Sequence, residues 1–264
     1  MRSLAASLVI FLLWNLIVGA FLLLADPWIG LPTALGFAAL LLWGFLLQPL
    51  GRESGPHRWA TLRLRPLDGP ALRWTLIAIP VLLLVGWSLG DVYTRLVPVP
   101  PASLDPFAPV MRTTGGRLTI AVFAIGVAPV VEEFVFRGLV QRVLERRLGT
   151  TAGIAGAAAL FALVHFLPWI FPLHFVLGVA FGFAVYATKS IWAGVILHAA
   201  NNAAALAGVE LSRGAPETTG SVWEIGLTAD LWISLCALVV ASIASFYVAR
   251  RLLAAGRGLR LRGF

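Results

Sequence analysis

The chain has 264 residues, of which 59% are hydrophobic and only 12% are charged. Soluble domains carry about 25% charged residues, so the composition excludes an ordinary soluble domain and predicts an all-α, polytopic integral membrane protein. The net charge of +8 does not indicate a nucleic-acid partner, because the arginines lie between apolar segments and form no single basic patch. The single cysteine, Cys236, excludes an intramolecular disulfide.

Eight apolar segments approach the length of about 20 residues that a membrane-spanning helix needs. In chain order they are 4–25, 30–50, 74–94, 117–136, 151–167, 173–188, 190–208 and 227–249. We interpret the first as a retained span and not a signal peptide, because its apolar run is long and carries no small-residue cleavage site. No repeat or linker divides the sequence, so we expect a single membrane domain over residues 1–264.

The basic residues predict the orientation in the membrane. If the N-terminus is cytoplasmic, every Lys and Arg falls on the inner side except Arg95, Arg112, Arg117 and Arg213. Positive residues are enriched in cytoplasmic loops, so we expect both termini and the loop 51–73 in the cytoplasm. In a prokaryotic cell the membrane would be the plasma membrane.

Two adjacent carboxylates, Glu132 and Glu133, end the apolar run that begins at Leu118. An ionisable group at membrane depth costs about 2.5–3.5 kcal/mol on insertion scales and therefore indicates a functional site. Among the acidic residues, we expect only this pair and Asp230 to lie in a span or at its edge. Arg137 follows Glu133 by four residues, which predicts an ion pair on one helix face.

Three further polar side chains interrupt later apolar segments: His165, His198 and Asn202. His198 and Asn202 are four residues apart and so share a helix face. Gly149 is typical of a helix end and predicts a turn between two antiparallel helices. Counting from that turn places Glu132 and His165 at one depth. We therefore expect these polar groups to converge in the cytoplasmic half of the membrane.

A carboxylate, two histidines and an amide at one depth are typical of a hydrolytic site. The carboxylate can act as a general base toward water, and a nearby His can hold that water or share its proton. A second His and an Asn can donate hydrogen bonds to the oxyanion of a tetrahedral intermediate. Alternatively, Glu and His side chains could bind a zinc ion that activates the water, and both possibilities stay open. His57 and His174 are interpreted as structural or surface residues.

The order of these groups resembles a known family. The motifs are Glu132-Glu133-x-x-x-Arg137, Phe161-x-x-x-His165 and His198-x-x-x-Asn202. They are similar to the three signature motifs of the CAAX-protease and bacteriocin-processing (CPBP) family, whose members are intramembrane endopeptidases and include CAAX prenyl endopeptidases. The resemblance covers about residues 118–208 and implies no cofactor, with zinc left open. The implied roles come in pairs: water activation for Glu132 and His165, oxyanion stabilisation for His198 and Asn202, and a structural or substrate-positioning role for Glu133 and Arg137.

The expected partners are a peptide or lipidated protein substrate and the lipid bilayer; the sequence does not indicate an oligomeric state. An alternative from another class is a proton-coupled transporter, in which Glu132, Glu133 and the histidines relay protons. Transporters often contain inverted repeats, and the lack of a repeat here argues against that class. A third possibility is a family member without catalysis that acts as a membrane scaffold or immunity factor.

Overall fold

The computed structural model describes residues 36, 40, 62–97, 99, 110–211 and 226–261. These residues form helices joined by short turns, and no β-strand occurs among them. The predicted all-α class is therefore confirmed. The predicted segments 4–25 and 30–50, apart from residues 36 and 40, lie outside the described residues, as does His57.

Each of the later six predicted segments contains a helix, although segment 151–167 is helical only to Leu163. The helices are α4 (Gly69–Leu96), α6 (Thr114–Ala121), α7 (Ala128–Glu133), α8 (Gln141–Leu148), α9 (Thr150–Leu163), α10 (Phe171–Thr188), α11 (Ile191–Leu211) and α13 (Ala229–Leu261). Two short 3₁₀ turns, η1 (Val110–Arg112) and η4 (Pro168–Ile170), precede α6 and α10. Two π-helical stretches, η2 (Val122–Val127) and η3 (Phe134–Val140), join α6, α7 and α8 into one helix over Thr114–Leu148. We call this helix the motif helix, because it carries the first motif.

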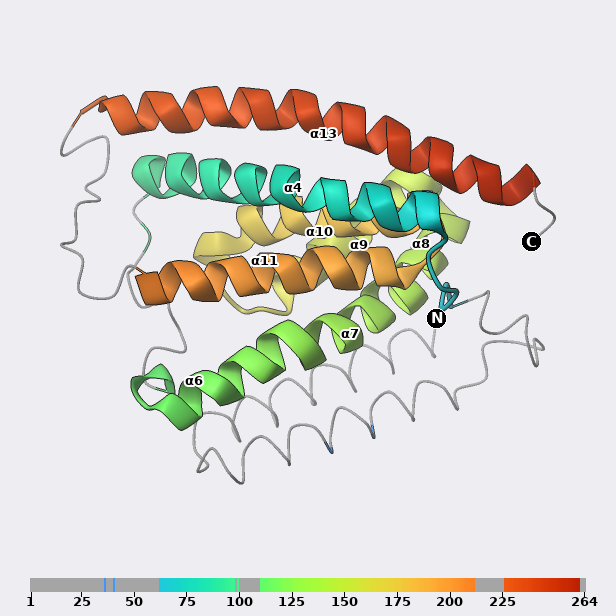
Figure 1. Cartoon of the computed structure of the whole chain (residues 1–264), viewed down its shortest axis with the longest axis horizontal. Coiled ribbons are helices and arrows are strands. Elements are labelled where there is room, and N and C mark those ends of the chain that lie inside the picture. The colour runs from blue at the N-terminus through green and yellow to red at the C-terminus, as the bar shows by residue number, and fades with distance from the viewer. Residues whose placement is uncertain are drawn as a thin grey trace.

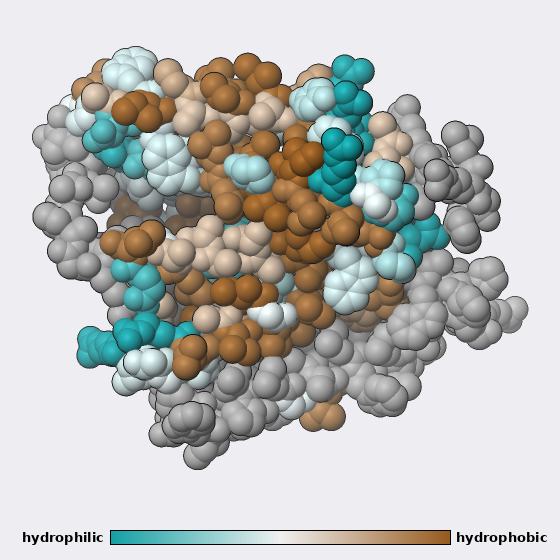
Figure 2. All heavy atoms as spheres, viewed as in Figure 1, coloured by the Kyte–Doolittle hydropathy of each residue, from teal (hydrophilic) through white to brown (hydrophobic). Residues whose placement is uncertain are grey.

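Within the described residues, four helices are long and apolar enough to cross a membrane: Gly69–Leu96, Thr114–Leu148, Pro168–Thr188 and Ala229–Gly256. The helix α9 is apolar but shorter. Figure 2 shows hydrophobic side chains gathered across the middle of one face, with hydrophilic ones toward its ends. Large apolar side chains on α13 face outward, with Phe246 68% exposed. These features suggest an integral membrane protein, while the count of about eight spans stays a prediction.

Helices α4, α11 and α13 run roughly along one axis (Figure 1). In this view α13 and α4 run side by side, and the motif helix crosses the bundle at an angle. Packing contacts join α4 to α13 and to α11, and α10 to both α9 and α11. The core lies where the motif helix meets α9, α10 and α11, and includes Val131, Phe136, Phe161, Phe181 and Leu197.

Local sequence explains where several helices begin and end. Asp68 caps α4 by accepting a hydrogen bond from the backbone N–H of Ala71 at 2.9 Å, as short acidic residues do at helix N-termini. Gly149 has a φ of 84° between α8 and α9, a conformation that side chains with a β-carbon disfavour. The turn predicted at Gly149 is therefore confirmed.

Segments predicted to share a side of the membrane lie together. At one end of the bundle, Arg63 pairs with Glu145, and its backbone carbonyl accepts from the N–H of Ile191 at 2.8 Å. At the other end, Arg117 and Glu210 approach to 4.0 Å. These contacts are compatible with the predicted grouping of the loops, while the topology and the end that faces the cytoplasm stay predictions.

One expectation about the acidic residues is wrong. Asp91 lies within α4, a candidate span, and accepts hydrogen bonds from Arg95 and Ser234, both at 2.8 Å. The sequence count of intramembrane acids omitted it. Arg95, one turn later, balances the charge of Asp91, and the hydroxyl of Ser234 on α13 donates a hydrogen bond to it. The carboxylate is therefore not left unpaired inside the span.

Candidate active site

Glu132 and Glu133 end the short α7, between the two π-helical stretches of the motif helix. Both residues are buried, at 8% and 0% relative exposure. A π-helical turn inserts an extra residue into the ladder of backbone hydrogen bonds, and such turns are frequent at functional sites. Both stretches therefore change the direction in which the flanking side chains point.

The predicted ion pair between Glu133 and Arg137 is confirmed. Nη1 of Arg137 donates to Oε1 of Glu133 at 2.7 Å, and both side chains are fully buried. Nη2 donates to the backbone carbonyl of Gly178 on α10 at 3.0 Å. The guanidinium therefore joins the motif helix to α10 while it balances the charge of Glu133.

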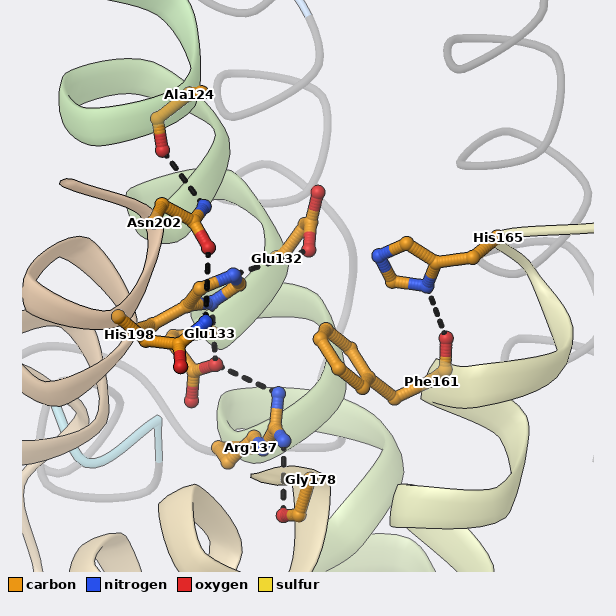
Figure 3. Close-up of polar contacts among 10 residues, drawn as sticks. Ala124, Glu132, Glu133, Arg137, Phe161, His165, Gly178, His198 and Asn202 are labelled. Carbon is orange, nitrogen blue, oxygen red and sulfur yellow. Dashed lines mark hydrogen bonds and ion pairs between the residues drawn. The ribbon is translucent and has the colours of Figure 1, made fainter. Parts of the chain in front are cut away.

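His198 lies beside both carboxylates (Figure 3). Its Nδ1 lies 3.1 Å from Oε1 of Glu133, and its Nε2 lies 3.8 Å from Oε2 of Glu132. Because Glu133 is paired with Arg137 as an acceptor, Nδ1 of His198 carries the hydrogen of this bond. The carboxylate of Glu133 thus fixes the ring, and Nε2 is directed toward Glu132.

Asn202 lies one turn after His198 on α11, on the face that the spacing predicts. Its Nδ2 donates to the backbone carbonyl of Ala124, in the π-helical η2, at 2.8 Å. Its Oδ1 accepts a longer hydrogen bond, 3.4 Å, from Nδ2 of Asn201. The amide is therefore oriented by contacts at both of its polar atoms.

Two aromatic rings enclose these groups. The guanidinium of Arg137 lies over the ring of Phe161 at 4.6 Å, within the range of a cation–π contact. The ring of Phe181 stacks on His198, with centroids 4.9 Å apart and planes at 16°. Phe161 belongs to the second motif, whereas Phe181 on α10 was not identified from the sequence. In the sequence, Phe181 differs from the other apolar residues of α10 only in lying about one turn after Gly178, whose carbonyl binds Arg137.

His165 lies at the edge of this cluster, just beyond the end of α9. Its Nδ1 is 2.7 Å from the carbonyl of Phe161, and its ring is 4.3 Å from that of His174. In Figure 3 the carboxylate of Glu132 lies between the rings of His198 and His165. The turn over Pro168–Ile170 brings His174 beside His165, a neighbour that the sequence gave no reason to expect.

The three motifs therefore meet in one place, as the depth count predicted, with the carboxylates, Arg137 and His198 buried and with His165 and Asn202 half-buried. Oε2 of Glu132 and Oε2 of Glu133 are buried without a hydrogen-bond partner among the described residues. Within the same part of the chain, no group of three or more His, Cys, Asp or Glu side chains is arranged to hold a metal ion. The arrangement offers an acceptor at Glu132, the Nε2 atom of His198 beside it, and a second amide hydrogen at Asn202.

A buried carboxylate and imidazole beside a half-buried amide, inside a bundle of membrane-length helices, are the kinds of group that an intramembrane hydrolytic site would use. The family described as "Type II CAAX prenyl endopeptidase Rce1-like" matches residues 114–204, from the start of the motif helix to just past Asn202. This match confirms the resemblance to the CPBP family drawn from the three motifs, and supports an intramembrane protease. No curated protein and no solved structure gives a significant match to the chain.

Proposed function

We propose that the protein is an intramembrane endopeptidase of the CAAX prenyl type, which hydrolyses a peptide bond of a membrane-associated substrate near the cytoplasmic face. The observation that carries this proposal is the buried, unpartnered Oε2 of Glu132 beside Nε2 of His198. The match of the Rce1-like family to this segment supports it. The lipid bilayer and a peptide or lipidated protein are the partners.

Glu132 is the general base in this mechanism. Its carboxylate takes a proton from water while the water oxygen bonds to the peptide carbonyl carbon, and the carbonyl electron pair moves to oxygen. When the tetrahedral intermediate collapses, the C–N bond breaks and the leaving nitrogen takes the proton back from Glu132. The products are a carboxyl terminus and an amine, and the base is restored.

His165 assists Glu132 in holding the water. Because Nδ1 of His165 faces the carbonyl of Phe161, the neutral ring carries its hydrogen there and presents Nε2 as an acceptor. A water held between that nitrogen and Glu132 has both of its hydrogens bound, and one of its lone pairs is directed at the substrate carbonyl.

His198 and Asn202 stabilise the oxyanion. His198 donates through Nε2 when it carries its second proton, and Asn202 donates with the Nδ2 hydrogen that is not bound to Ala124. The negative charge that leaves Glu132 when it is protonated reappears on the oxyanion, so the positive charge of His198 stays balanced throughout. Such preorganised donors contribute about 10²–10³-fold to the rate each.

Glu133 and Arg137 hold this arrangement in place. Glu133 fixes the ring of His198, and Arg137 balances Glu133 and binds α10 through Gly178. The protein has about eight transmembrane helices in this proposal, with both termini in the cytoplasm. A prenylated segment of the substrate would lie in the bilayer while its peptide enters the site.

The decisive experiment compares Glu132→Gln with the wild type in proteoliposomes, using a fluorogenic peptide in prenylated and unprenylated forms. Loss of a positioned base lowers the rate about 10²–10⁴-fold, while the substitution keeps the side-chain shape. The matched control is Asp230→Asn, which removes an exposed carboxylate at the start of α13. Cleavage that persists undiminished in Glu132→Gln would contradict the proposal.

The same preparation separates the alternatives. Metal analysis of the wild-type protein distinguishes the two hydrolytic mechanisms, because stoichiometric zinc whose removal abolishes cleavage would replace the metal-free water activation by a zinc-bound water. A pH-dependent flux across the liposomes without cleavage of any peptide would instead establish the transporter.

A further inference from the structure

The backbone carbonyl of Ala124 is released from the motif helix by two features of its sequence and geometry. In an α-helix this oxygen would accept from the N–H of residue 128, and in a π-helix from that of residue 129. The N–H of Ala128 donates to the carbonyl of Phe123 instead. Residue 129 is a proline and has no N–H to donate. Both helical donors for Ala124 are therefore removed.

Asn202 takes the place of those donors. Its Nδ2 lies 2.8 Å from the released oxygen of Ala124. An unsatisfied carbonyl in a water-poor interior is costly, so the amide is held with its nitrogen toward Ala124. The nitrogen carries two hydrogens, and the bond to Ala124 uses one of them. The other points in a direction that this bond determines.

We propose that Pro129 is a positioning residue for Asn202: by denying Ala124 a backbone donor, it makes the carbonyl of Ala124 the fixed acceptor that orients the oxyanion-binding amide. This inference rests on the proposed function for its catalytic meaning. It links the segment that supplies Glu132 to a donor on α11, since Pro129 lies three residues before Glu132 in the same buried stretch. In this proposal, the π-helical stretch before the two carboxylates contributes to the reaction by leaving a carbonyl free to orient Asn202.

The first test is a double-mutant cycle in activity between Pro129→Ala and Asn202→Ala. Alanine restores an N–H at position 129 and so gives Ala124 a backbone donor. We expect Pro129→Ala to lower kcat roughly 10–10²-fold with KM unchanged, because a small misplacement of a reacting group costs up to about 10²-fold. The double variant should be no slower than Asn202→Ala alone. Multiplicative losses would overturn the inference, since they would show that Pro129 acts on the base instead.

The second test uses thermal unfolding in detergent and needs no enzymatic activity. In the wild type, Asn202→Ala leaves the carbonyl of Ala124 unsatisfied and should lower the unfolding midpoint. In the Pro129→Ala background the backbone satisfies that carbonyl, so Asn202→Ala should lower the midpoint by clearly less. Equal decreases in both backgrounds would overturn the inference. A wild type that cleaves nothing would contradict the proposed function alone, and this second cycle would still decide the role of Pro129.

One alternative variant and one control variant complete the two tests. Pro129→Val also restores the N–H but fills the space of the proline ring, so it leaves no cavity and remains usable if the alanine variant fails to fold because packing is lost. Pro80→Ala is the matched control, because Pro80 lies inside α4 with its side chain exposed. It should change neither kcat nor the effect of Asn202→Ala on the unfolding midpoint. Coupling between Pro80 and Asn202 as strong as that of Pro129 would overturn the inference.

Discussion

Two pairs of an acid and an arginine, each four residues apart on one helix, lie inside candidate spans of this protein. Arg137 binds Glu133 at 2.7 Å on the motif helix, and Arg95 binds Asp91 at 2.8 Å on α4. Each acid also faces a polar side chain of another helix. For Glu133 this is His198 at 3.1 Å, and for Asp91 it is Ser234 at 2.8 Å.

The two pairs differ in whether the polar atoms around the ion pair have hydrogen-bond partners. Around Asp91 the polar groups bind one another, and Arg95 extends to Thr228 at the start of α13. The motif helix instead supplies a second carboxylate, Glu132, whose Oε2 has no hydrogen-bond partner among the described residues and lies 3.8 Å from Nε2 of His198. A buried ion pair alone therefore indicates helix packing. A buried acceptor without a hydrogen-bond partner, beside an oriented imidazole, indicates a site that can bind and activate a reactant.

The largest expected effect is on stability and comes from removing either arginine. Arg137→Ala leaves the fully buried Glu133 unpaired and should lower the free energy of unfolding by about 3–5 kcal/mol. Arg95→Ala removes a hydrogen-bonded partner of the less buried Asp91 and should cost about 1.5–3 kcal/mol. Denaturant unfolding in detergent measures both. Equal stability of Arg137→Ala and the wild type would show that the pair on the motif helix contributes nothing.

The next effect separates the two acids by activity. Glu133→Gln weakens the hold on His198, and groups that orient a reacting residue typically contribute about 10–100-fold to activity. We expect a loss of that size in kcat. Asp91→Asn should leave kcat unchanged while lowering the unfolding midpoint. Peptide cleavage and thermal unfolding of the same preparations test this difference. An equal loss of kcat in both variants would show that the two acids do not differ in function.

Much of the fold and of the candidate site could be predicted from the sequence, because these features depend on local spacing. The pairing of Glu133 with Arg137, the shared face of His198 and Asn202, and the turn at Gly149 each follow from helical periodicity or backbone preference. The six described segments were also found from their apolar length alone.

The remainder depends on contacts between distant parts of the chain. The π-helical stretches that flank the carboxylates have no simple periodic signal, so the release of the carbonyl of Ala124 was not predicted. Phe181 and His174 reach the site only because α10 packs against α9 and α11. Asp91 was overlooked because an apolar run dominates its segment, although Arg95 one turn later is the same local signal that identified Glu133.

A third effect concerns space beside the acids. Gly194 on α11 packs directly against Glu133, and a β-carbon there would collide with Oε2 of Glu133 and lie 2.9 Å from Cγ2 of Val185. Gly194→Ala should therefore cost about 1–3 kcal/mol of stability, as overpacking of a buried site does, and should also lower kcat. Gly90→Ala is the control beside Asp91, since a β-carbon there meets nothing within 4 Å. Unfolding and cleavage assays that find Gly194→Ala as well tolerated as Gly90→Ala would show that Glu133 can move.

The smallest expected effect tests the aromatic rings. Phe181 stacks on His198 at 4.9 Å in the site, while Trp74 and Tyr247 meet edge to face at 5.9 Å between α4 and α13. An aromatic contact contributes about 0.5–1.5 kcal/mol beyond its buried area. If that contact orients the ring of His198, Phe181→Leu should lower kcat by about tenfold at most, because 1.4 kcal/mol corresponds to tenfold.

Tyr247→Leu removes the corresponding contact in the other region and should leave kcat at the wild-type value. The informative quantity is the ratio of the two kcat values, measured with one peptide at saturating concentration. A ratio near one would mean that Glu133 alone holds His198, and the ring would then serve only to keep water away. A ratio near ten would place Phe181 beside Glu133 among the groups that hold the imidazole toward Glu132, and would extend the difference between the two regions from their charges to their packing.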